Sequence, residues 1–204
     1  MRTRDGWGFH PVAKASDSPE VSIVKTAFNF SFAALVVMLM NSPVASDAAG
    51  NTSESRGQLS EKDYKFACEA ATGGLMEVKA GELAKTKAAD PAVKQFGEKM
   101  VTDHGKAGDE LKAIAAQKGA TLPTELDNKQ QKFINRLHGL TGKDFDKAYA
   151  DEMLDDHKKD LKEFQSAAEK TEDVDLRSFA AKTATVIAQH LEHAQQLAAN
   201  VNRK

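Results

Sequence analysis

The chain of 204 residues has one cysteine, Cys68, few aromatic residues (6%) and no excess of basic charge. A single cysteine excludes an intramolecular disulfide, and with it a small disulfide-stabilised scaffold. The formal net charge of −2 leaves no basic surplus to neutralise phosphates, so we expect no nucleic-acid partner. The apolar/polar alternation of β-strands is also lacking. With 41% hydrophobic and 28% charged residues, the composition instead favours a helical domain of ordinary size.

The sequence also lacks an apolar run long enough to cross a membrane, although a shorter run lies near the N-terminus. Residues 27–40 are apolar except for Asn29 and Ser31; Lys25 precedes them, and small residues follow at 44–46 and 48. The run is shorter than the ~20 residues that usually span a bilayer. A cationic start, a short apolar run and a small-residue site are typical of a secretory signal peptide. An uncleaved inner-membrane anchor is the alternative.

These features divide the chain into three parts. Residues 1–46 are predicted to be an N-terminal extension with a signal peptide, residues 47–58 a flexible linker, and residues 59–204 a helical domain. We therefore expect a periplasmic or secreted protein that has peripheral or no membrane contact once the signal peptide is removed.

From Leu59 onward, apolar residues recur at three- and four-residue spacing, and helix breakers fall between the periodic stretches. This pattern predicts four long helices, at approximately 60–88, 91–119, 141–170 and 176–201. The connection between the second and third carries apolar residues that predict one short helix within it. Ser60 and Asp63 form a predicted capping pair, and Pro91 suits the first turn of the second helix.

The predicted fold class is all-α. Two short-turn hairpins of long helices would bury their apolar stripes against each other as a four-helix bundle. The long connection could run back along the bundle and make the third helix parallel to the second, which is the ferritin-like arrangement. An up-down bundle with a side helix is the alternative.

Three histidines and one glutamate interrupt the apolar stripes. His104, His157 and His190 each lie between apolar residues at helical spacing, and Glu77 lies at the edge of the first stripe. Two of the histidines share the pattern Met-x-x-Asp-His, in "EKMVTDHGKA" and "DEMLDDHKKD". Counting from the two hairpin turns places Glu77 level with His104, and His157 level with His190. We therefore expect all four side chains in one layer near the middle of the bundle.

Buried polar side chains need partners, and one metal ion would satisfy all four residues at once. Three imidazoles and a carboxylate suit a divalent transition metal, namely zinc, iron, manganese or copper. The sequence therefore predicts a metal site formed by Glu77, His104, His157 and His190. The alternative is a metal-free layer of hydrogen-bonded core histidines that fixes the register of the helices.

Three further residues lie close to this layer along the chain. Asp103 and Asp156 stand about 100° around the helix from their histidines. They are interpreted as further ligands, as acceptors that orient an imidazole ring, or as surface residues. His193 follows His190 by one helical turn, at the edge of the stripe, and is either a ligand or a surface residue. The remaining two histidines fall outside the predicted core.

Several stretches resemble a known family. They include "GGLMEVKAGELA", "VKQFGEKMVTDHGKA", "LTGKDFDKAYADEMLDDH" and "SFAAKTATVIAQHLEHAQQL". Over residues 60–201 the chain is similar to the bacterial domain of unknown function 4142, a group of exported ferritin-like proteins often labelled membrane or outer-membrane proteins. The resemblance implies that the following residues occupy motif positions: Glu77, Asp103, His104, Asp146, Tyr149, His157 and His190. Tyr149 is thereby another candidate to support the metal layer. Where the family usually has Leu-Pro in the last helix, this chain has Ala184, Thr185 and Val186, which removes an expected kink.

The di-iron motif Glu-x-x-His is missing, because the residue three before each inward histidine is Val101, Leu154 or Ile187. The sequence thus argues against a ferroxidase or oxygenase and favours a role without catalysis. Three hypotheses follow: an exported metal-binding bundle used in metal handling or envelope stress, a structural or interaction module of the cell envelope, and a small metalloenzyme with an open coordination position.

Overall fold

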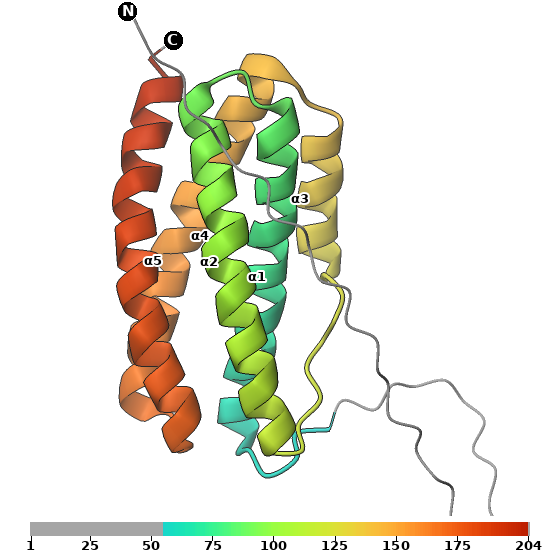
Figure 1. The fold of residues 1–204 in the computed structure, drawn as a ribbon, viewed down its shortest axis with the longest axis vertical. Helices are drawn as coiled ribbons and strands as arrows, with labels where there is room; N and C mark the ends of the chain where they lie inside the picture. Colours follow the sequence, from blue (N-terminus) through green and yellow to red (C-terminus); the bar gives the residue numbers. More distant parts are fainter. Residues whose placement is uncertain (1–54, 204) are drawn as a thin grey trace, which may run out of the picture. The chain divides into compact units, whose positions relative to one another are not determined.

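The computed structural model describes residues 55–203, and five helices make up most of this part of the chain (Figure 1). They are α1 (Glu61–Lys87), α2 (Pro91–Gln117), α3 (Asn128–His138), α4 (Gly142–Lys170) and α5 (Val174–Val201). The four long helices and the short one in the connection are therefore confirmed. No helix within residues 55–203 has the length and apolar character needed to cross a membrane. The predicted signal peptide and residues 47–54 of the predicted linker lie outside the described residues.

Polar side chains cap the starts of four helices. Ser60, Asp90, Asp127 and Asp173 each accept a hydrogen bond from a backbone N–H in the first turn of α1, α2, α3 and α5. Such caps each contribute about 1 kcal/mol. Pro91 opens α2, where its missing N–H costs no hydrogen bond. The last helix, α5, runs unbroken through residues 184–186, as expected without the family's proline.

The connection between α2 and α4 fixes the topology. A bridge pairs Ala88 with Gly142, so α4 begins beside the end of α1. Since α1 and α2 form one hairpin and α4 and α5 another, α4 runs parallel to α2, and residues 118–141 cross the length of the bundle to join them. Helix α3 lies along α1 on this crossing (Figure 1). The ferritin-like arrangement is confirmed, and the up-down alternative is wrong.

Each hairpin turn is held by an aspartate from the other hairpin. The two oxygens of Asp146 on α4 accept from the backbone N–H groups of Ala89 and Asp90, at 3.0 and 2.9 Å. Asp63 on α1 accepts from the N–H groups of Glu172 and Asp173, the latter at 2.9 Å. Both carboxylates are buried. They tie together chain segments that only the tertiary fold brings into contact.

Helices α1 and α2 cross closely at two glycines. A Cβ atom on Gly97 would lie 2.7 Å from the Cβ of Ala84 and 2.9 Å from the carbonyl oxygen of Gly81. A Cβ on Gly81 would lie 2.6 Å from the carbonyl oxygen of Gly97. Real Cβ atoms do not approach so closely, so the lack of side chains at both positions sets the spacing of α1 and α2.

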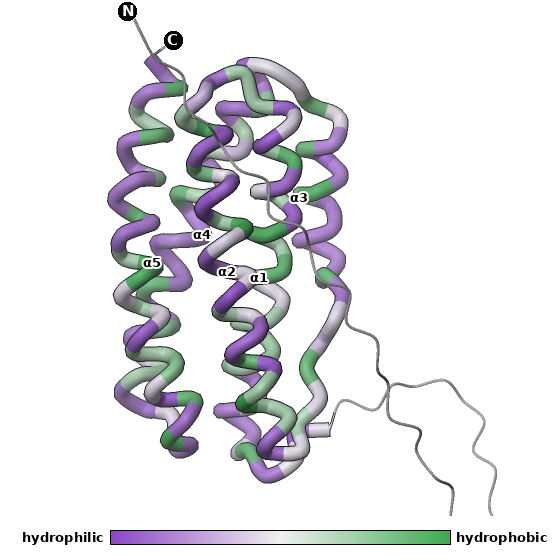
Figure 2. The backbone as a smooth tube through the Cα atoms, in the orientation of Figure 1, coloured by the Kyte–Doolittle hydropathy of each residue, from purple (hydrophilic) through white to green (hydrophobic). Residues whose placement is uncertain are grey.

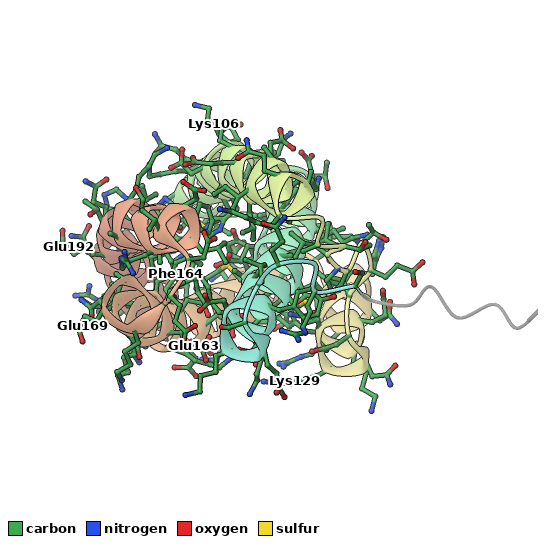
Figure 3. All side chains as sticks on the ribbon, turned by 90° about the horizontal axis from the view of Figure 1, so that it is seen from below. Lys106, Lys129, Glu163, Phe164, Glu169 and Glu192 are labelled. Carbon is green, nitrogen blue, oxygen red and sulfur yellow. The ribbon has the colours of Figure 1, made fainter. Side chains whose placement is uncertain are left out.

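The core consists of two apolar clusters. Along each long helix hydrophobic residues alternate with hydrophilic ones (Figure 2), and seen along the bundle Lys106, Glu169 and Glu192 extend outward (Figure 3). One cluster contains Met100, Phe145 and Met153, and the other Leu111, Phe164 and Ile187. On α2, α4 and α5 the buried histidines fall between residues of the two clusters. A polar layer therefore separates the two apolar halves.

Candidate metal centre

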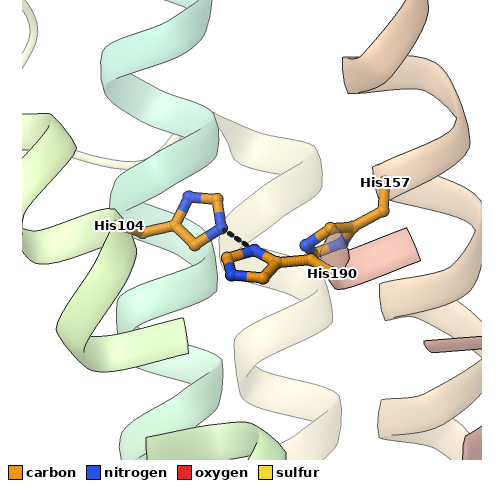
Figure 4. Close-up of side chains that lie close together, drawn as sticks. All are labelled: His104, His157 and His190. Carbon is orange, nitrogen blue, oxygen red and sulfur yellow. Dashed lines mark hydrogen bonds between the residues drawn. The ribbon is translucent and has the colours of Figure 1, made fainter. Parts of the chain in front are cut away.

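Glu77 and the three histidines meet in this layer. The Nδ1 of His104 lies 2.7 Å from Oε2 of Glu77, and the Nδ1 of His157 lies 3.4 Å from Oε1. The Nε2 of His104 lies 3.3 Å from the Nδ1 of His190. The three rings face one another from α2, α4 and α5 (Figure 4). All four residues are buried, so the predicted convergence is confirmed.

One nitrogen of every ring is held by an oxygen. The Nδ1–H of His104 donates to Glu77, and the Nε2–H of His190 donates to Oδ2 of Asp103 at 2.9 Å. The Nδ1–H of His157 donates to the carbonyl oxygen of Met153 at 2.8 Å. Histidines that bind metals almost always donate their other N–H to a carboxylate or a carbonyl, which fixes the tautomer and the ring orientation. The layer follows this pattern three times.

The remaining ring nitrogens are Nε2 of His104, Nδ1 of His190 and Nε2 of His157. One nitrogen from each ring lies within 4.8 Å of the others. Two nitrogens bound to one ion at about 2.0–2.1 Å lie about 3.3 Å apart in a tetrahedral site, which is the spacing of the His104 and His190 nitrogens. With the other nitrogens already donating, the space between these two nitrogens holds either a proton that His104 donates to His190 or a metal ion bound by both lone pairs.

The protein environment keeps two of the three rings neutral. Burial lowers the pKa of His157, and it lowers that of His190 to about 4 despite the hydrogen bond to Asp103. Burial also lowers the pKa of His104, but the charge of Glu77 outweighs it and the net shift is upward. Burial raises the pKa of Glu77, and the nearby histidines more than reverse this. The layer thus offers two neutral imidazoles, those of His157 and His190, beside one ionised carboxylate, and His104 releases a proton when it binds a metal.

Three buried polar atoms around the layer have no hydrogen-bond partner within the described residues. They are Oε1 of Glu77, Nε2 of His157 and the hydroxyl of Tyr149. Burial raises the pKa of Tyr149, so it stays protonated. Its ring stacks on Phe145 and meets Phe96 edge-on. Since nearly all buried polar atoms in proteins have partners, an imidazole nitrogen and a carboxylate oxygen left bare together fit a site for a cation.

The residues predicted to support the layer have different surroundings. Asp103 holds His190, and Lys99 donates to the same Asp103 oxygen at 2.7 Å. Asp156, which has the matching place in the repeated motif, binds no histidine, and its Oδ2 has no partner within residues 55–203. His193 is exposed and lines a groove between α2 and α5 together with Asp103. One motif therefore gives the two aspartates different neighbours.

Sequence reasoning missed Asp160. It follows Asp156 by one helical turn on α4, and both residues are half-buried. Burial and the charges of Glu152 and Glu77 raise the pKa of Asp156 to about 7, and burial with the charges of Glu77 and Asp156 raises that of Asp160 to about 8. The sequence signal that could have identified Asp160 is its i, i+4 spacing from Asp156, next to the inward-facing His157.

Comparisons with known proteins place the fold. No protein with curated annotation matches the chain. Among solved structures, a DUF305 fragment from Deinococcus radiodurans is similar with a TM-score of 0.61 at 6% identity, covering 72% of this chain and 99% of that one. CopM in its Cu(I)-bound form is similar with a TM-score of 0.57 at 15% identity, covering 68% and 96%.

A third similar structure is a DUF305 protein from Streptomyces coelicolor, named as a candidate secreted protein, with a TM-score of 0.58, 12% identity and coverage of 69% and 93%. At these identities the likeness shows the fold alone. The sequence pattern of the family described as "Domain of unknown function (DUF4142)" matches residues 48–197, which include the whole polar layer. The resemblance seen in the sequence is thereby confirmed, and the chain belongs to the DUF4142 family.

Proposed function

We propose that the bundle binds one transition-metal ion, copper in the first place, between His104, His157 and His190, and that the protein serves in metal handling. The observation that carries the proposal is the pattern of hydrogen bonds. Every ring is held at one nitrogen by an oxygen, one nitrogen from each ring lies within 4.8 Å of the others, and Nε2 of His104 and Nδ1 of His190 are 3.3 Å apart. A layer that only fixed helix register would not leave Nε2 of His157 buried without a partner within the described residues.

The donor set narrows the choice of metal. Imidazole nitrogens suit copper and zinc, whereas manganese prefers carboxylate and water oxygens. The buried carboxylate of the layer, Glu77, is already engaged as an acceptor for His104. Copper(II) binds nitrogen sites more tightly than zinc does, in line with the general order of affinities. CopM, whose fold is similar, has Cu(I)-, Cu(II)- and silver-bound forms, which supports copper.

The proposal gives Glu77 a specific part. Its Oε2 orients His104, and its Oε1, which has no hydrogen-bond partner within the described residues, is available to bind the ion directly. The variant Glu77→Ala removes the orienting acceptor and leaves the three histidines in place. Loss of an orienting acceptor costs about 10- to 100-fold in metal affinity, whereas loss of a ligand such as His104 removes stoichiometric binding.

The test is metal analysis of the full chain purified without a histidine tag. We expect about one equivalent of copper and a rise in melting temperature, since a ligand at 100 times its Kd stabilises the folded state by about 2.7 kcal/mol. His190→Ala should abolish both effects. His193→Ala is the matched control, because this exposed histidine lies one turn away on the same helix. Sub-stoichiometric binding of every transition metal, with no thermal shift, would leave the metal-free structural layer as the better reading.

We also propose that the protein acts outside the cytoplasm, in the periplasm or after secretion. The cationic start and short apolar run of residues 25–40 support export. The candidate secreted DUF305 protein of similar fold agrees with it. N-terminal sequencing of exported material should begin near Asp47 or Ala49. Recovery of the intact chain in the membrane fraction would favour an anchor instead.

A further inference from the structure

A groove of about 180 Å³ lies where α1, α3 and α4 meet, and carboxylates dominate its walls. We call it the acidic groove. Its acidic residues are Glu69, Asp127, Glu152, Asp156, Asp160 and Glu163. The only basic residues in its walls are Lys129 and Lys159. Figure 3 shows Glu163 and Lys129 on either side of α1 at this face of the bundle. The groove therefore carries a local excess of negative charge on a chain that is nearly neutral overall.

The acidic groove adjoins an internal cavity that reaches the polar layer. The cavity has a volume of about 30 Å³, and both Glu77 and His104 line it. That is enough room for a water molecule or a small ion. Glu69, Asp160 and Glu163 line both the cavity and the groove, as does Gly73. A Cβ at Gly73 would meet nothing within 4 Å, so this wall is open where the two spaces join.

The inner end of this path carries polar atoms that lack partners. Oε1 of Glu77 is buried without a hydrogen bond, in a residue that is 1% exposed, and Glu77 lines the cavity. Oδ2 of Asp156, in the wall of the groove, is also buried without a partner. A buried, unpaired carboxylate oxygen is costly unless a cation or water visits it. One of these two oxygens therefore lies in the wall of the groove, and the other belongs to the residue that lines the cavity beside the histidines.

The other two approaches to the layer suit a cation less well. The groove between α2 and α5, of about 660 Å³, contains Lys99, whose ammonium group lies 2.7 Å from Asp103 and opposes an incoming positive charge. The groove between α1 and α2, of about 370 Å³, reaches His104, but its walls are mainly apolar, with one Lys112 and one Asp109. Neither offers a cation a run of negative groups to replace its water shell.

We propose that the acidic groove is the route by which a metal cation reaches the histidine layer, with Glu69 and Glu163 attracting the hydrated ion and Glu77 receiving it inside. This inference rests on the proposed metal site and adds to it a route and a selection for cations. Clefts lined by charge of one sign raise the local concentration of the opposite ion and accelerate association, most strongly at low ionic strength. If the acidic groove is the route, its carboxylates increase the rate of metal uptake, an effect that the histidine site alone does not predict.

The test is stopped-flow uptake of Cu²⁺ by the full chain at low and high salt, alongside equilibrium titration. Glu69→Gln and Glu163→Gln, at two residues that line both the cavity and the groove, remove charge while keeping size. We expect the association rate at low salt to fall about tenfold in the double variant, with a weaker salt dependence than the wild type. The dissociation rate should fall too, so that Kd changes less than the association rate. Glu98→Gln, an exposed carboxylate lining the α2–α5 groove, is the charge-matched control and should bind at the wild-type rate.

A steric variant checks the same route by another mechanism. Gly73→Val places a side chain where the cavity and the acidic groove join, and should slow uptake in both low and high salt. Gly105→Val puts the same side chain into open space at the α1–α2 groove and should not. Wild-type rates in both the charge variants and Gly73→Val, with copper still bound stoichiometrically, would overturn the route but keep the site. No copper uptake by the wild-type chain would overturn both.

Discussion

Replacing Gly97 by alanine tests whether the close crossing of α1 and α2 holds the polar layer together. The new Cβ would lie 2.7 Å from the Cβ of Ala84, where carbon atoms prefer about 3.5–4.0 Å, so the helices must separate by about 1 Å. Overpacking of this kind costs about 1–3 kcal/mol. The better helix propensity of alanine returns up to about 1 kcal/mol. We expect a net loss of about 1–2 kcal/mol.

Gly108→Ala is the control on the same helix. A Cβ at Gly108 meets nothing within 4 Å, so only the propensity gain remains and this variant should be more stable by about 0.5–1 kcal/mol. Urea unfolding followed by circular dichroism at 222 nm, the standard helix signal, gives both values on one scale. The two glycines should therefore respond in opposite directions to the same substitution.

The crossing also bears on the site. Gly81, which faces Gly97, lies one turn from Glu77 on α1, so separating the helices should lengthen the 2.7 Å contact between Glu77 and His104. Copper affinity should fall in Gly97→Ala and stay unchanged in Gly108→Ala. If Gly97→Ala is as stable as the wild type, the close crossing does not constrain the bundle and this reasoning is wrong.

Three further predictions concern single groups. His104→Ala and His157→Ala should each remove most of the copper-linked stabilisation and the double variant little more, since ligands of one ion are not additive; thermal shifts with and without a chelator test this, with His138→Ala as the unaffected control. The raised pKa of Asp160, about 8, means that the folded chain keeps a proton that the unfolded chain releases above about pH 4. Stability should therefore fall as pH rises from 4 to 8, and Asp160→Asn should gain at least about 1 kcal/mol at pH 8 and little at pH 4, measured by urea unfolding. Asp146→Ala, which strips two backbone N–H groups of their buried acceptor, should cost about 2–4 kcal/mol in the same assay, and Asp146→Asn about half as much.

The polar layer was predictable because the number of residues along a regular helix gives the position of a side chain along the bundle axis. Each residue adds 1.5 Å, so counting from Pro91 and Asp173 fixed the levels of the inward residues before any packing was known. The apolar stripes fixed which way they face. The arithmetic needs only regular helices and short turns, and both are present. Hence His104 and His190 end up 3.3 Å apart although 86 residues separate them.

The partners of the aspartates could not be predicted in the same way. Asp103 and Asp156 have the same sequence neighbours, but α5 flanks one and the acidic groove the other. Asp63 shows the same difficulty. Ser60 does cap the N–H of Asp63, as predicted, yet the Asp63 side chain crosses to the start of α5 at Asp173 instead of returning to Ser60. The local sequence determines the cap at Ser60, whereas the backbone N–H groups of Glu172 and Asp173 come within reach of Asp63 only in the packed bundle.

The placement of Asp160 and Glu77 links stability to function. Burial and the charge of Glu77 raise the pKa of Asp160 to about 8, so Asp160 stays protonated at neutral pH in the metal-free bundle. A bundle shaped by stability alone would have apolar residues there, because replacing buried charges by well-packed apolar side chains is often neutral or stabilising. A cation between the two carboxyl groups favours the ionised form of Asp160, so the arrangement that weakens the metal-free bundle strengthens the metal-bound one. Copper-linked stabilisation should therefore shrink in Asp160→Asn even though the three histidines are intact, whereas a structural role for Asp160 would lower the stability of both forms equally.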